Sequence, residues 1–145
     1  EPSSLSRSDG KRLDGMTMMP WKQGRCLVWD VTCPDTLAPS HLNCAVTGHG
    51  AVATEAEMNK RLKYEEICRT FHFIPIAVET LGALGDDAMT FMKDLGARIR
   101  TVTQESRAFE FLMQRVSVAI QRGNAACVLG TVPSTSALDD IYYLV

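Results

Sequence analysis

Three short runs of apolar and β-branched residues stand out from the polar positions of the chain, and each has the length of a β-strand. The first two cover about residues 12–19 and 25–33, and Pro-Trp-Lys-Gln-Gly between them is typical of a hairpin connection. The third covers residues 72–79 and contains Pro75, which cannot donate to a neighbouring strand. Pro75 therefore predicts an edge position or a bulge.

Apolar residues three and four positions apart predict helices over about 54–71, 86–103 and 106–122. Thr54 followed by Glu57 matches a capping box at the start of the first helix. Gly123 predicts the end of the third helix, and residues 125–132 fit either a short strand or a helical turn. The order hairpin, helix, strand, helix, helix predicts an α/β fold in which helices flank a small mixed sheet.

Composition describes a single globular domain. The chain has 145 residues, of which 46% are hydrophobic and 22% charged, with a formal net charge of −2. We expect a polar lead-in over residues 1–11, a folded domain over 12–132 and a tail over 133–145, and the first residue, Glu1, suggests a piece of a longer protein. No apolar run has the length of a membrane span, so a membrane partner is not expected.

The cysteines indicate a reducing, intracellular setting. There are five, an odd number, and no two are spaced as Cys-x-x-Cys, so neither a disulfide framework nor a zinc ribbon is predicted. His41, Cys44 and His49 are conceivable metal ligands, but no matching second pair accompanies them.

Asp30 is the anomaly in the second predicted strand, because a carboxylate in a buried strand is costly unless it is paired or bound to a metal. Asp14 lies on the first strand, and a hairpin can bring the two acids together. Two converging carboxylates can hold a hard divalent cation such as Mg²⁺. The alternative reading of Asp30 is a turn residue at the end of a strand.

Lys60 and Lys63 on the next predicted helix are the cations that would complete a phosphodiester-cleaving site. A divalent ion activates water, and an ammonium group stabilises charge on the phosphate. The alternative reading is a solvated helix face, because several acidic and basic residues lie beside these lysines.

Four segments together resemble the restriction-endonuclease-like domain of non-long-terminal-repeat retrotransposon proteins, in which the nuclease follows a reverse transcriptase. They are Arg12-Leu13-Asp14-Gly15-Met16-Thr17, Pro20-Trp21-Lys22-Gln23-Gly24-Arg25, Leu27-Val28-Trp29-Asp30-Val31-Thr32-Cys33-Pro34-Asp35 and Lys60-Arg61-Leu62-Lys63-Tyr64. The run from Phe73 to Gly82 is similar to the strand and turn that follow in such domains, and the resemblance covers about residues 12–130.

The resemblance implies a PD-(D/E)-x-K nuclease fold that nicks DNA with Mg²⁺ or Mn²⁺, within a larger nuclear protein that has other domains. In that family the two metal-binding acids fall on Asp14 and Asp30, and the catalytic lysine, moved to the following helix, falls on Lys63, with Lys60 as the alternative. Glu57 or Glu79 would be a further acid near the metal.

The chain also departs from the family pattern. Leu13 stands where the family has proline before the first Asp, and Thr32 occupies the usual lysine position of the wider superfamily. Arg7-Ser8-Asp9-Gly10 looks like a partial second copy of the first motif, but no good strand follows it. Two other readings therefore remain: a catalytically decayed nuclease fold that binds nucleic acid or protein, and an ordinary small α/β interaction domain.

Overall fold

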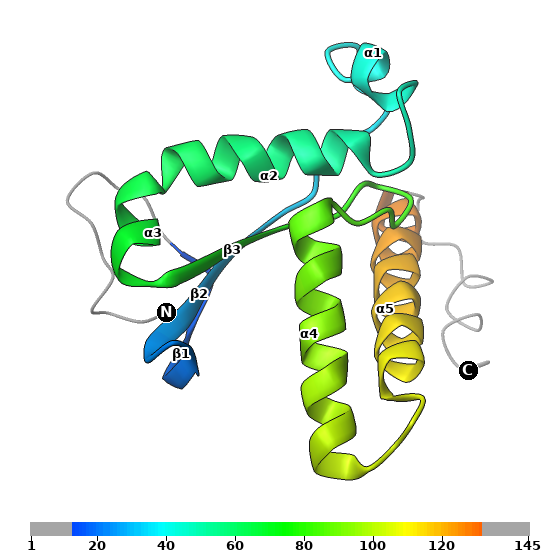
Figure 1. Ribbon diagram of the computed structural model, residues 1–145. Helices are drawn as coiled ribbons and strands as arrows, with labels where there is room; N and C mark the ends of the chain where they lie inside the picture. The colour runs from blue at the N-terminus through cyan, green and yellow to red at the C-terminus, as the bar shows by residue number, and fades with distance from the viewer. Residues whose placement is uncertain (1–12, 132–145) are drawn as a thin grey trace.

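The computed structural model describes residues 13–131, so the predicted lead-in and tail lie outside the described residues. A three-stranded sheet in the order β1-β2-β3 is flanked by helices (Figure 1). Its strands are β1 (Gly15–Lys22), β2 (Arg25–Thr32) and β3 (His72–Ala77). β1 is antiparallel to β2 and β3 is parallel to β2, which confirms the predicted α/β class with a small mixed sheet.

The hairpin between β1 and β2 turns more tightly than predicted. Only Gln23 and Gly24 separate the strands, with φ of 51° and 73°. Two residues in the left-handed region match the twist of a two-residue hairpin, which allows β1 to continue to Lys22. The register of the pair shifts on both sides of Pro20, where the chain has no amide N–H to donate.

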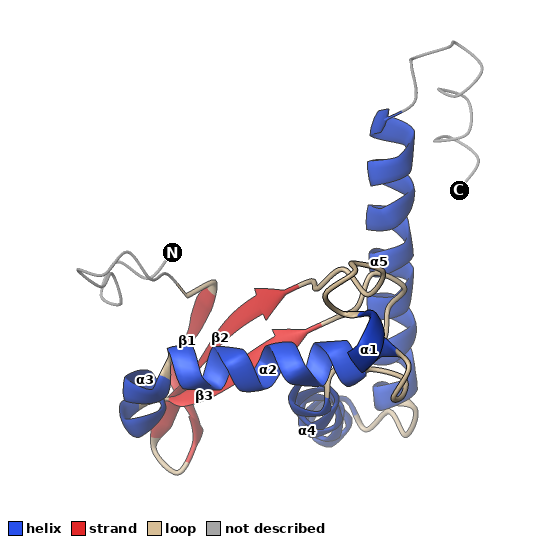
Figure 2. Cartoon of the chain, turned by 90° about the horizontal axis from the view of Figure 1, so that it is seen from above, coloured by secondary structure: helices blue, strands red, loops and turns tan. Residues whose placement is uncertain are grey.

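β3 lies at the edge of the sheet, as Pro75 predicts. Its register pairs Val28 with Phe73 and Asp30 with Pro75. A parallel pair requires a crossover connection, which here consists of α1 (Leu42–Ala45), α2 (Ala51–Lys63) and α3 (Glu65–Thr70). The crossover therefore lays α2 along the sheet (Figure 2).

The helix predicted over residues 54–71 is two helices, and its predicted capping box is wrong. α2 begins after Gly50, whose φ is 79°, and Tyr64 separates α2 from α3. Thr54 lies inside α2, where its hydroxyl accepts a hydrogen bond from the amide of Asp86 at 3.3 Å. Glu57 does not reach back to the start of its own helix, because its carboxylate accepts hydrogen bonds from β3 and from the helix that follows β3.

α4 (Asp86–Thr103) has its predicted bounds, whereas α5 (Ala108–Thr131) passes through the predicted stop at Gly123. One glycine costs a helix only about 1 kcal/mol, and Asn124 donates to the carbonyl of Thr80 at 2.6 Å. The two helices pack side by side (Figure 1). Gly96 allows this approach, because a Cβ there would lie 2.9 Å from the Cα of Phe109.

The core lies between the sheet and the α2–α3 pair. Its buried residues are Leu13, Val28, Tyr64, Ile67 and Phe73. On α4, Phe91 contacts Trp21 of β1 with ring centroids 5.7 Å apart, and this contact ties the hairpin to the helical layer. Within residues 13–131, no helix is both long and apolar enough to cross a bilayer.

Candidate active site

Asp30 is a buried carboxylate near the C-terminal end of β2, with 5% of its surface exposed. Side chains alternate along a strand, so Asp30 shares a face with the core residue Val28 and points toward the helices. It forms an ion pair with Lys60. Its other oxygen lies 3.4 Å from the hydroxyl of Tyr64, which donates to it. Asp30 is therefore a paired interior acid and not a turn residue.

α2 and the helix break bring these two partners to Asp30. Lys60 and Tyr64 are four positions apart and so lie on the same side of the chain. Tyr64 is 1% exposed, and its ring packs against Phe73 with centroids 5.2 Å apart. Burial, followed by the charge of Asp30, raises the pKa of Tyr64, and the ammonium of Lys60 opposes that shift. The phenol therefore stays protonated and can donate to Asp30.

Asp14 lies just before β1 and is held against the neighbouring residue of β2. Its carboxylate accepts a hydrogen bond from the amide of Val31 at 2.5 Å, and its own amide donates to the carbonyl of Trp29 at 3.1 Å. The charge of Asp14 also contributes to the raised pKa of Tyr64. Asp14 itself is exposed, and its structural link to Asp30 is the amide of Val31, the residue after Asp30.

Lys63 occupies a different position from Lys60. Its ammonium lies 5.0 Å from the centroid of the Tyr64 ring. Lys60 and Lys63 both line an open cleft of about 380 Å³. One wall is α2, and the opposite wall is formed by Thr32 at the end of β2 and by Pro34 and His41 in the segment that follows. The two lysines are therefore not equivalent: Lys60 neutralises Asp30, whereas Lys63 lies over the ring of Tyr64.

Glu57 and Glu79 are not additional acids at this site, because each accepts hydrogen bonds at the start of a helix. Glu57 accepts from the amides of Asp87 and Ala88 at 2.8 and 2.9 Å, at the start of α4. Glu79 accepts from the amides of Val52 and Ala53 at 3.2 and 3.4 Å, at the start of α2. Backbone donors at a helix N-terminus favour an anionic acceptor. Sequence reasoning missed both roles, since the helices that they cap are distant in the chain.

The oxygen donors of Asp14 and Asp30 suit a hard divalent cation. Mg²⁺ commonly uses only one or two protein carboxylates and keeps several waters. Across residues 13–131, no cluster of three or more His, Cys, Asp or Glu side chains is arranged to hold a metal. His41, Cys44 and His49 are therefore not grouped as a metal site in this part of the chain. The Nδ1 of His41 instead lies 2.8 Å from the carbonyl of Asp35.

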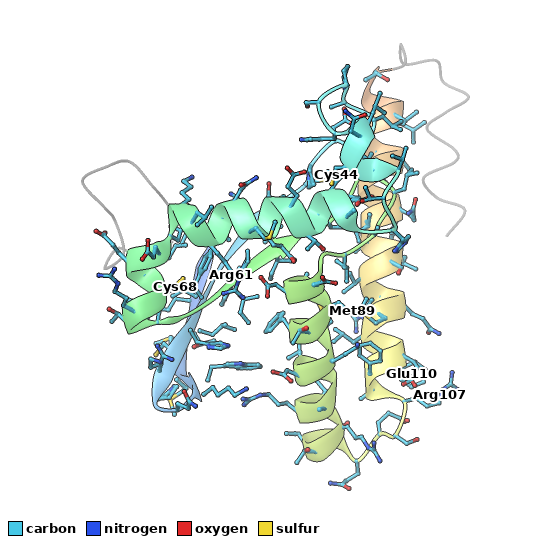
Figure 3. All side chains as sticks on the ribbon, turned by 45° about the horizontal axis from the view of Figure 1, so that its top comes forward. Cys44, Arg61, Cys68, Met89, Arg107 and Glu110 are labelled. Atoms are coloured by element: carbon cyan, nitrogen blue, oxygen red, sulfur yellow. The ribbon has the colours of Figure 1, made fainter. Side chains whose placement is uncertain are left out.

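Arg61 illustrates how the surrounding cations of α2 are used. It leaves the helix on the side that faces α4 (Figure 3) and forms two hydrogen bonds of 2.7 Å with the carboxylate of Asp87. Burial and this partner act in opposite directions on the pKa of Arg61, and the hydrogen bond prevails and raises it. Arg61 therefore joins α2 to α4 and does not line the cleft.

Comparisons with protein-family models, curated proteins and solved structures give no match to this chain.

Proposed function

We propose that this domain is a metal-dependent DNA endonuclease of the restriction-endonuclease-like class, which nicks DNA as part of a longer retroelement protein with a reverse transcriptase, working in the nucleus. The observation that carries the proposal is the buried Asp30 on β2, with Lys60 on its carboxylate and Asp14 held one residue away. A buried acid paired with a lysine that lines a cleft supports the proposal, because it places a carboxylate and a cation next to a space that a substrate can enter.

In this proposal Asp14 and Asp30 would hold Mg²⁺ or Mn²⁺. The ion supplies Lewis-acid activation of water and charge neutralisation at the phosphate. Lys60 already contacts Asp30, so it is the lysine nearest the acid and would stabilise negative charge on the phosphate. Tyr64 is a positioning residue, because its hydroxyl orients the carboxylate of Asp30 from beneath.

A nicking assay on supercoiled plasmid tests the proposal, with Mg²⁺, Mn²⁺ or a chelator. We expect nicking with metal, none with chelator, and none from Asp30→Ala, because that change removes a metal ligand while the basic residues that bind phosphate stay. Thermal melts check that the variant is folded. A folded Asp30→Ala protein that nicks at the wild-type rate would show that the site is wrongly assigned.

The second candidate function is a decayed nuclease fold that binds nucleic acid or protein without cutting. The ion pair favours it, because Lys60 already neutralises the acid that a metal would need. Leu13, in the position of the family's proline, is 5% exposed and belongs to the core, so it serves packing. A wild-type protein that binds DNA but never cuts it with either metal would support this alternative.

A further inference from the structure

We propose that Lys63 and Asn59 form a subsite for a backbone phosphate of a single nucleic-acid strand, next to the bond that the Asp30–Lys60 pair would cleave. The proposal rests on the nuclease function above and names the part of the substrate that the cleft receives. Four observations carry it: the cleft itself, the polarity along α2, the available charge of Lys63, and the rigid support beneath that residue.

The cationic and amide side chains of the cleft gather at one end of a single helix face. Its α2 residues recur three or four positions apart, so they form one continuous stripe. They are Val52, Glu55, Ala56, Asn59, Lys60 and Lys63. From Val52 to Lys63 the stripe spans about 16 Å of helix at 1.5 Å per residue. Both lysines and the amide of Asn59 lie at the end near Asp30, and the acidic Glu55 lies toward the other end.

Lys63 differs from the other cations of α2 and α3 in its partners. Lys60 pairs with Asp30, Arg61 with Asp87 and Arg69 with Glu65. No ion pair joins Lys63 to an acid among residues 13–131, and its described contact is the face of Tyr64. An exposed ammonium beside a cleft, without an acid to neutralise it, suits an anion from outside the protein.

The support under Lys63 is rigid. Tyr64 is buried, its ring packs on Phe73, and its hydroxyl donates to Asp30. The phenol therefore contacts Asp30 through its hydroxyl and the Lys63 ammonium through its ring face. This arrangement places Lys63 next to Asp30, and a phosphate at Lys63 would place the neighbouring phosphodiester toward Lys60. Asn59, one helical turn before Lys63, adds an amide donor on the same stripe.

A cleft between a helix and a loop can receive the backbone of one strand at a time, which in a duplex would be the nicked strand. The chemical class of the ligand is therefore a phosphodiester chain. Free inorganic phosphate shares the same charge, so the experiment must separate the two sources.

The experiment measures binding without cleavage. A fluorescently labelled single-stranded DNA oligonucleotide is titrated with the 145-residue protein in chelator, at several salt concentrations, and binding is followed by anisotropy. We expect Lys63→Ala to weaken binding about 3- to 10-fold and to reduce the salt slope by about 0.7, the value for one phosphate contact on a single strand. Asn59→Ala should weaken binding less, because it removes no charge. Lys63→Arg should retain most of the wild-type affinity, because it keeps the positive charge.

Lys93→Ala is the matched control, because Lys93 is also an exposed lysine on a helix but lines a separate groove on α4. It should leave the affinity and the salt slope close to wild type. Equal losses from both lysine variants, wild-type binding by Lys63→Ala, or no oligonucleotide binding by the wild type would each overturn the subsite. Displacement of the oligonucleotide by inorganic phosphate at equal phosphate concentration would also overturn it, since the site would then select a free anion.

The plasmid assay separates this proposal from the nuclease function. Normal strand binding through Lys63 with no metal-dependent nicking would retain the subsite and overturn the nuclease. Nicking that requires Asp30, together with wild-type binding by Lys63→Ala, would retain the nuclease and overturn the subsite.

Discussion

Gly85 is a glycine because of the space that Glu57 occupies, and this relation allows a sharp test of the structure. Its φ of −70° and ψ of 169° suit any residue, so backbone conformation does not require glycine. A Cβ at Gly85, however, would overlap the carboxylate of Glu57. That carboxylate accepts hydrogen bonds from the amides of Ala77, Asp87 and Ala88. Gly85→Ala should therefore destabilise the fold by displacing Glu57.

The loss in unfolding free energy can be estimated from the backbone amides that lose their acceptor. Glu57→Ala leaves the buried amides of Ala77 and Ala88 unpaired, at about 1–3 kcal/mol each. Release of a buried carboxylate offsets part of this cost, which gives a net loss of about 2–4 kcal/mol in the free energy of unfolding. Gly85→Ala alone should cost a similar amount. In the Glu57→Ala background it should cost less than about 1 kcal/mol, because the overlapping atoms are gone.

Urea unfolding of the wild type, both single variants and the double variant, followed by circular dichroism, measures the coupling between the two sites. The reasoning is refuted if the double variant loses as much unfolding free energy as the two single variants together, to within about 0.5 kcal/mol, since independent sites are additive. Gly123→Ala is the matched control, because no atom lies within 4 Å of a Cβ there. It should leave stability unchanged or raise it slightly.

Two further predictions concern charge. Burial raises the pKa of Glu57 above its usual 4.5, so its contribution to stability is full below that value and is lost as the pH rises through the raised folded pKa. The unfolding free energy of wild type relative to Glu57→Gln should therefore fall as the pH rises above about 4.5, and a rise would show that the amide hydrogen bonds outweigh burial. Lys60→Met should lower stability by about 1–3 kcal/mol, because the buried carboxylate of Asp30 loses the ammonium that donates to it. In thermal melts Mn²⁺ should then stabilise this variant more than the wild type; equal stabilisation would mean that Asp30 does not bind the metal.

The candidate site shows what a local pattern can and cannot indicate. The sequence singled out Asp30 because a charge interrupts an apolar strand, and Asp14 because it lies on the preceding strand of a predicted hairpin; that the two bind one metal stays a prediction. The sequence left the choice between Lys60 and Lys63 open, because residues three positions apart lie on the same face of a helix. The packing of Tyr64 separates them: the helix break after Lys63 buries the phenol beneath Asp30, so that Lys60 contacts the acid and Lys63 lies over the face of the Tyr64 ring.

By itself the sequence determined the presence and order of the three strands, the edge position of β3 and the extent of α4, because these depend on local periodicity and on proline. Tertiary structure alone decided which helix ends the buried glutamates cap and that α5 continues beyond Gly123. Those outcomes depend on partners distant in the chain: Glu57 accepts from β3 and α4, and Asn124 donates to Thr80. A local pattern cannot contain them, because the free energy of a buried donor depends on the acceptor that the fold brings to it.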